Sequence, residues 1–161
     1  MLGNEQQLLN DNVHVFRVRV YYEDTDAAGI VYYANYFRFA ERARTEMLRS
    51  AKIDQNTLFE TSGVRFVVRS CNIEYLKPAR LDDELEVHTR LRGIRGASLV
   101  AKQIVQGDQG TTACLDLRIA CVDQAEVGLI DSRFDAPGDI ETWLSQCDEP
   151  KEVRYAIELA L

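Results

Sequence analysis

The alternation of apolar and polar residues near the N-terminus predicts a strand over residues 14–22. From Phe16 to Tyr22 every second side chain is apolar or aromatic, and arginines fill positions between them. Residues 23–33 follow no period and contain Gly29, so this stretch is expected to form a loop. The chain therefore begins with a half-buried strand that runs into an irregular connection.

The hydrophobic period changes to that of a helix over residues 34–52. Apolar residues recur there at helical spacing, at Tyr36, Ala40, Ala43, Met47 and Ala51. The wide apolar stripe suits a long helix that lies across a sheet. Asp54 is placed to cap a second, short helix that ends at Gly63.

Strand-like runs dominate the rest of the domain, over residues 64–76, 83–92, 97–106 and 111–123. Gly93 and Gly96 bracket an expected turn between the second and third of these runs. Later in the chain, Pro137 suits the first turn of a helix that would extend to Cys147. The element order predicts an α+β fold, with an antiparallel sheet of about five strands wrapped around one long helix.

Length and charge divide the chain into three parts. Its 161 residues, 46% of them hydrophobic, suit one domain with a sizeable core. The net charge is -7, and residues 131–161 contain eight acidic and three basic side chains. We therefore expect a polar N-terminal tail at 1–12, a folded domain at 13–130 and an acidic extension at 131–161.

Composition excludes several classes of protein. The nearly neutral body has no broad basic face for nucleic acid, and no apolar run is long enough to span a membrane. The N-terminus does not resemble a signal peptide, so a cytoplasmic location is predicted. The cysteines lack the spacing of a metal site, so no metal or other cofactor is expected; they are Cys71, Cys114, Cys121 and Cys147.

The densest group of chemically active residues is EDTDAAGIVYYAN, at positions 23–35. Its three carboxylates precede the longest predicted helix, whose unpaired N–H groups can stabilise a developing oxyanion. A carboxylate there can activate water or attack a carbonyl directly. The same residue types also cap helices and form turns, so a structural role stays open. A calcium loop is excluded because Ala28 has no ligand oxygen at the fifth loop position and Asn35 replaces the bidentate glutamate at the twelfth.

The segment RVYYEDTDAAGIVYYANYFRFAERARTEMLR, at 19–49, resembles the 4-hydroxybenzoyl-CoA thioesterase superfamily, nearest the tol-pal system-associated acyl-CoA thioesterases. Residues 66–87 and 94–100 support the resemblance. It implies a hotdog fold, assembled as a homodimer or homotetramer with active sites at the subunit interface. It also implies hydrolysis of acyl-CoA to free CoA and a carboxylic acid, without a metal.

The resemblance implies roles for five residues. Asp26 matches the catalytic aspartate, as nucleophile or general base, and Gly29 matches the loop glycine beside it. Tyr33 matches the residue whose backbone N–H polarises the thioester carbonyl; several relatives have histidine there, which favours a backbone role. Arg95 and Ser98, at the expected turn and strand start, match positions that contact the CoA nucleotide.

Two other functions remain open from the sequence. One is a non-catalytic module that binds acyl groups or acyl carrier protein. The other is a hotdog-fold dehydratase, which would require a well-placed histidine base; only His14 and His88 are available. The acyl group itself is not predicted, although aromatic residues around the helix start, together with Phe66, are expected to shape its pocket.

Overall fold

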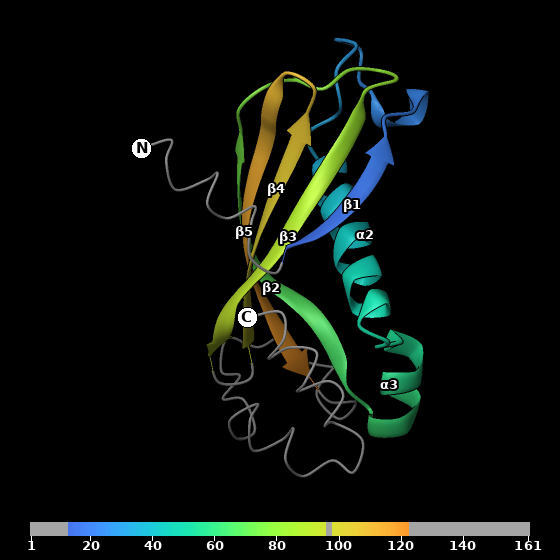
Figure 1. The fold of residues 1–161 in the computed structure, drawn as a ribbon, viewed down its shortest axis with the longest axis vertical. Helices are drawn as coiled ribbons and strands as arrows, with labels where there is room; N and C mark the ends of the chain where they lie inside the picture. The colour runs from blue at the N-terminus through green and yellow to red at the C-terminus, as the bar shows by residue number, and fades with distance from the viewer. Residues whose placement is uncertain (1–12, 96–97, 123–161) are drawn as a thin grey trace.

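The computed structural model describes residues 13–95 and 98–122, which form one sheet and three helical segments (Figure 1). The elements in chain order are β1 (His14–Arg19), the short 3-10 helix η1 (Tyr22–Asp24), α2 (Asn35–Ser50), α3 (Gln55–Ser62), β2 (Arg65–Tyr75), β3 (Glu84–Arg95), β4 (Ser98–Gly107) and β5 (Gly110–Val122). The tail at 1–12, the extension at 131–161 and the expected helix from Pro137 to Cys147 lie outside the described residues.

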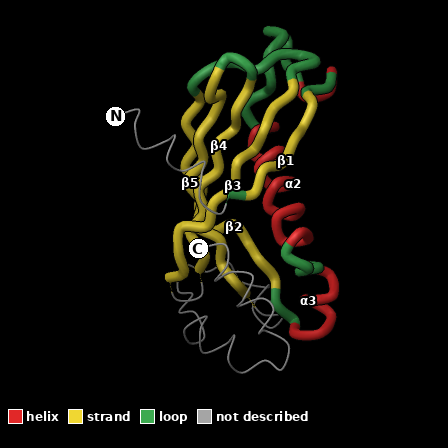
Figure 2. The backbone as a smooth tube through the Cα atoms, in the orientation of Figure 1, coloured by secondary structure: helices red, strands yellow, loops and turns green. Residues whose placement is uncertain are grey.

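The five strands form an antiparallel sheet in the order β1-β3-β4-β5-β2, so β1 and β2 are its edges. Two residues of sequence separate β3 from β4 and β4 from β5, and both pairs of strands are antiparallel neighbours in the sheet. Figure 2 shows both α-helices on the same side of this sheet. The α+β architecture predicted from the sequence is confirmed.

The core lies between α2 and the sheet. Phe39 and Ala43 of α2 are fully buried, and so are Leu85 and Val87 of β3 and Leu115 of β5. These strand residues belong to the apolar half of each alternating pattern, which is why that face of the sheet accepts the helix. The helix packs mainly against β1 and β3, which leaves the edge strand β2 largely exposed.

The predicted short helix is confirmed, with the expected cap at each end. The Thr57 N–H donates a hydrogen bond of 2.8 Å to the Asp54 carboxylate. This bond, which favours the charged carboxylate, lowers the pKa of Asp54. Gly63 ends the helix with a φ of 72°, a conformation that glycine adopts without a side-chain clash.

Two predicted boundaries are wrong for local reasons. β1 ends at Arg19 rather than at Tyr22, because the next residues turn into η1. The expected turn between Gly93 and Gly96 is also misplaced: β3 continues through Gly93 to Arg95. A β-bulge between Leu91 and Gly93 absorbs one extra residue and lets pairing with β4 continue.

Candidate active site

The Asp26 loop is a tight hairpin rather than an irregular connection. Thr25 pairs with Val31, and the Asp26 N–H donates to the Ile30 carbonyl at 2.9 Å. The Gly29 N–H closes the turn on the Asp26 carbonyl, also at 2.9 Å. Gly29 has a φ of 76°, and no heavy atom lies within 4 Å of where a Cβ would stand. This position therefore favours glycine because of its positive φ, and not because a side chain would clash with a neighbour.

The Asp26 carboxylate is exposed and only partly engaged. Its Oδ1 accepts a hydrogen bond of 2.8 Å from the Ala28 N–H, as in the turns that aspartate commonly forms. Among the described residues, nothing donates to Oδ2. One oxygen thus holds the side chain in place while the other stays available to water or to a bound carbonyl group.

The neighbouring carboxylate of Asp24 has a structural role. Asp24 is 6% exposed, and its Oδ2 accepts from the Tyr21 N–H at 2.8 Å. Its carbonyl accepts from the Tyr32 N–H at 2.8 Å and from the buried Asn35 amide at 2.9 Å. These bonds attach the loop to the start of α2. The structural role that the sequence left open for this acidic loop therefore belongs to Asp24. Asp26 makes none of these bonds to the helix start.

The N-terminus of α2 lacks a side-chain cap. Ala34 occupies the cap position, and its methyl group cannot accept a hydrogen bond. The Asn35 N–H donates to the Tyr32 carbonyl at 2.8 Å, but within the described residues the Tyr33 N–H donates to no acceptor. Unpaired N–H groups and the helix dipole make such a terminus favourable for an oxygen that carries partial negative charge.

Aromatic side chains from the segment before α2, from α2 and from β2 gather beside Tyr33. The Tyr75 hydroxyl donates to the Tyr33 carbonyl at 3.1 Å, and the Tyr75 and Tyr36 ring centroids lie 5.5 Å apart. The Tyr32 and Tyr33 rings lie 4.6 Å apart. Hydrogen bonding to the Tyr33 hydroxyl raises the pKa of Tyr32, and the Asp26 charge adds to this effect. Tyr75 was not predicted, because only tertiary folding brings β2 beside the start of α2.

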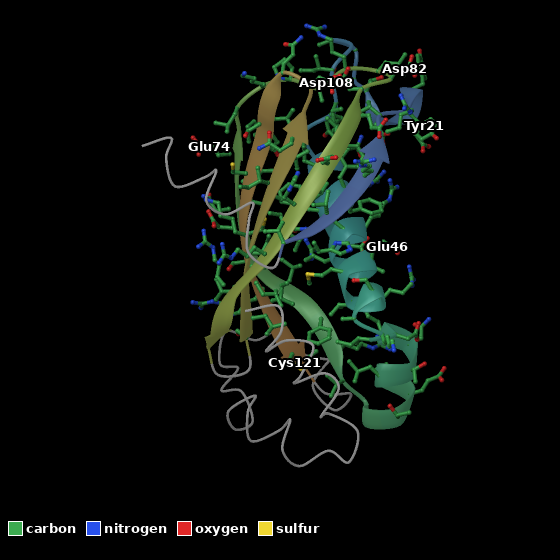
Figure 3. The ribbon with its side chains drawn as sticks, viewed as in Figure 1. Tyr21, Glu46, Glu74, Asp82, Asp108 and Cys121 are labelled. Carbon is green, nitrogen blue, oxygen red and sulfur yellow. The ribbon has the colours of Figure 1, made fainter. Side chains whose placement is uncertain are left out.

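Arg95 and Ser98 lie at the opposite end of the sheet. Glu84, where β3 begins, pairs with Arg19 just before the Asp26 loop, and Arg95 is the last residue of β3. The 12 residues of this strand span roughly 36 Å. Figure 3 shows the two ends, with Tyr21 and Asp82 near one and Cys121 near the other. One chain therefore does not bring Asp26 together with Arg95 and the buried Ser98.

Neither histidine stands beside the Asp26 turn. His14 begins β1 opposite Thr89, and burial lowers its pKa. His88 lies on β3 with its Nε2 3.1 Å from the Glu86 carboxylate, so it has an acidic neighbour that the sequence did not predict. Across the described ranges, no three histidine, cysteine, aspartate or glutamate side chains gather as metal ligands.

Comparison with known proteins assigns the family. A model of the thioesterase superfamily matches residues 28–114, and the chain belongs to that superfamily. The acyl-CoA thioester hydrolase YbgC of Escherichia coli is 50% identical over 115 residues, which cover 70% of this chain and 85% of that protein. The acyl-CoA thioesterase YbgC of Haemophilus influenzae is 44% identical over 113 residues, covering 70% and 83%.

A solved structure agrees with the architecture. A probable thioesterase from Bartonella henselae superposes with a TM-score of 0.68 at 32% identity, covering 70% of this chain and 94% of that one. The strand order and the long helix are thus those of the hotdog fold, and the resemblance drawn from residues 19–49 is confirmed.

Proposed function

We propose that this protein hydrolyses acyl-CoA thioesters to free CoA and a carboxylic acid. The observation that carries the proposal is the pairing of an exposed Asp26 carboxylate with an unpaired Tyr33 N–H at an uncapped helix start. A carboxylate in the hairpin and a donor at the helix start that follows it supply the two groups that acyl transfer requires. The printed names of the Escherichia coli and Haemophilus influenzae relatives support the same substrate class.

In the proposed reaction, the thioester carbonyl oxygen accepts a hydrogen bond from the Tyr33 N–H, which stabilises the charge that develops on that oxygen. Asp26 then acts in one of two ways. As a nucleophile it attacks the carbonyl carbon and expels the CoA thiolate, and water hydrolyses the resulting anhydride. As a general base it takes a proton from water, whose oxygen attacks the same carbon; the C–S bond then breaks and the CoA thiolate leaves and takes up the proton. No metal or other cofactor takes part in either route.

The test is the rate of acyl-CoA hydrolysis by Asp26→Asn, with Glu23→Gln as the matched control. Both changes neutralise one exposed carboxylate in the same loop. Loss of the catalytic group is expected to lower kcat by at least about a hundredfold, whereas the control keeps its rate. Near-wild-type turnover by Asp26→Asn contradicts the role of Asp26.

The same assay separates the two rival functions. A module that only binds acyl groups or acyl carrier protein releases no CoA from any acyl-CoA. A dehydratase converts a 3-hydroxyacyl-CoA to an enoyl-CoA and leaves the thioester intact. Release of free CoA together with the 3-hydroxy acid is the result that we expect.

We further propose that the working enzyme is a homodimer or a homotetramer with shared sites. The exposed edge strand β2 supports this, because Val67 and Val68 are 37% and 43% exposed beside unpaired backbone groups. Two copies can pair antiparallel along this edge around a two-fold axis. Such pairing places the Tyr75 end of one β2 beside the Arg65 end of the other.

A site shared between two copies of the chain would bring Asp26 close to Arg95 and Ser98, which lie far apart in one chain. The Arg65 end of β2 lies at the same end of the sheet as Ser98, because Arg65 pairs with Val122 and Ser98 pairs with Ala120. A second copy would therefore bring its Arg95 and Ser98 toward the Asp26 hairpin of the first. We propose that these two residues hold the CoA nucleotide there, with Arg95 on phosphate.

The remaining proposals concern the cellular setting. Within the described residues, no helix is long and apolar enough to cross a membrane. We propose a cytoplasmic enzyme that acts on acyl-CoA, with acyl carrier protein as a further partner and an association with the tol-pal system. The resemblance to the tol-pal-associated thioesterases supports these proposals, and nucleic acid is not an expected ligand.

A further inference from the structure

A partly buried arginine lies on α2, away from the Asp26 hairpin. The Arg44 Nη1 donates a hydrogen bond of 2.8 Å to Oε1 of Gln103, which has no exposed surface. The Gln103 amide group in turn donates to the Ala40 carbonyl and to the Thr89 hydroxyl, each at 2.9 Å. The Gln103 side-chain amide contacts both the Arg44 guanidinium group and the Ala40 carbonyl. The Arg44 side chain therefore points back along α2, and its guanidinium group lies near the level of Ala40.

The Arg44 guanidinium group forms no direct ion pair within the described part of the chain, because no carboxylate there lies within ion-pair distance of it. Glu41, one turn earlier on α2, accepts a hydrogen bond of 2.8 Å from the Thr45 hydroxyl. Burial lowers the pKa of Arg44, because it removes hydration from a charged group, and the charge of Glu41 opposes this decrease. A partly buried cation without a direct ion pair is costly, and a ligand anion in contact with it would compensate for that cost.

Arg44 marks one end of a seam of side chains between α2 and β2. At the other end, Tyr75 of β2 contacts Tyr33 and Tyr36 at the start of α2. Near Arg44, burial raises the pKa of Cys71 on β2, and the Arg44 charge opposes that rise. Ile73, half-buried, lies between Cys71 and Tyr75 on the same face of β2. The seam thus joins the open Tyr33 N–H to the guanidinium group.

The geometry of α2 and the geometry of β2 give similar lengths for this seam. Seven residues of helix, from Tyr33 to the level of Ala40, rise roughly 10 Å. Four residues of strand, from Tyr75 to Cys71, extend roughly 13 Å. An acyl group whose carbonyl meets the Tyr33 N–H would therefore reach Arg44 with a chain of medium length.

We propose that Arg44 is a specificity-determining residue that binds a carboxylate at the far end of the acyl group. The preferred substrates are then medium-chain acyl-CoA thioesters with a terminal carboxylate. Their methylene chain lies along Tyr36, Tyr75 and Ile73, and their carboxylate accepts hydrogen bonds from the guanidinium group. This inference rests on the proposed hydrolysis of acyl-CoA and names its substrate class.

The test compares kcat/KM for suberoyl-CoA and octanoyl-CoA, which differ only in the terminal carboxylate. Wild type should prefer suberoyl-CoA. Arg44→Met should lower kcat/KM for suberoyl-CoA by about tenfold to a hundredfold, the range of a hydrogen bond to a charged group. The loss of kcat/KM should be clearly smaller for octanoyl-CoA, and the octanoyl-CoA hydrolysis that remains shows that the variant is folded. Arg44→Lys should restore part of the preference, and Arg42→Met, an exposed site on the same helix, should have no effect.

Each other outcome overturns a defined claim. If wild type hydrolyses octanoyl-CoA at least as well as suberoyl-CoA, the carboxylate preference is wrong and the hydrolase assignment stands. If Arg44→Met lowers both rates equally, or changes only the oligomeric state, Arg44 stabilises the protein or its assembly and does not select the substrate. If wild type hydrolyses neither thioester, nor shorter and longer members of both series from adipoyl to sebacoyl, the proposed function fails with the inference.

Discussion

The peptide groups of Tyr33 and its side chain lie in different surroundings. Its N–H is unpaired within the described residues, its carbonyl accepts from the Tyr75 hydroxyl, and its own side chain is 58% exposed. The position of the peptide group therefore depends on Tyr75 and on the hairpin before it. The Tyr33 hydroxyl contributes to none of these backbone bonds.

At this scale we predict that Tyr33→Phe changes kcat for acyl-CoA hydrolysis by less than about threefold, because the substitution keeps the backbone donor. The measurement is steady-state kinetics on one acyl-CoA, with Tyr75→Phe as a comparison. Tyr75→Phe removes the hydrogen bond that holds the Tyr33 carbonyl and is expected to lower the rate more. A loss of about a hundredfold in Tyr33→Phe, the effect of removing a general acid, would assign chemistry to the phenol group.

Among the elements, α2 depends on a polar contact as well as on its apolar face. Gln103 of β4 connects β3, through the Thr89 hydroxyl, to the helix backbone at Ala40 and to the Arg44 side chain. An amide group in an apolar layer is tolerated only because its donors and its acceptor find partners. This contact sets where α2 lies on the sheet, and with it the positions of Tyr33 and Arg44.

We predict that Gln103→Leu lowers the free energy of unfolding by about 1–3 kcal/mol, since it leaves buried polar groups without partners. Chemical denaturation measures the change. Gln106→Leu is the control, because Gln106 also lies on β4 but makes a single half-buried bond, to the Thr111 hydroxyl. Equal losses in the two variants would show that the buried contact adds no particular stability.

For the whole molecule, the length of β3 separates Asp26 from Arg95, so a site that uses both residues, as we propose, requires a second copy of the chain. A single chain carries the proposed reacting group at one end of the sheet and the proposed nucleotide contact at the other. A single ion contact with a solvated phosphate is weak, so Arg95→Ala should raise KM by roughly five- to thirtyfold and leave kcat nearly unchanged. This rise in KM should shrink as the salt concentration increases.

Mixing two inactive or weakened variants tests the shared site. Asp26→Asn and Arg95→Ala are co-expressed and assayed below KM. A one-to-one mixture that pairs at random should recover about a quarter of wild-type activity, since half of the dimers contain one intact site. Recovery no greater than that of the two variants assayed separately would place both residues' functions within one chain, or exclude Arg95 as a ligand of CoA.

The sequence by itself determined the α+β class, the long helix, the capped short helix and the family, because hydrophobic period, capping residues and a dense motif are local signals. It placed Asp26, Gly29 and Tyr33 in one short segment, and the hairpin keeps them together. Only the tertiary structure decided that Asp24 braces the loop, that Tyr75 holds Tyr33 and that the Arg44 guanidinium group contacts the buried Gln103. It also moved Arg95 from an expected turn to the end of a strand. Those facts depend on strand order and on contacts between residues distant in the sequence, which no local pattern encodes.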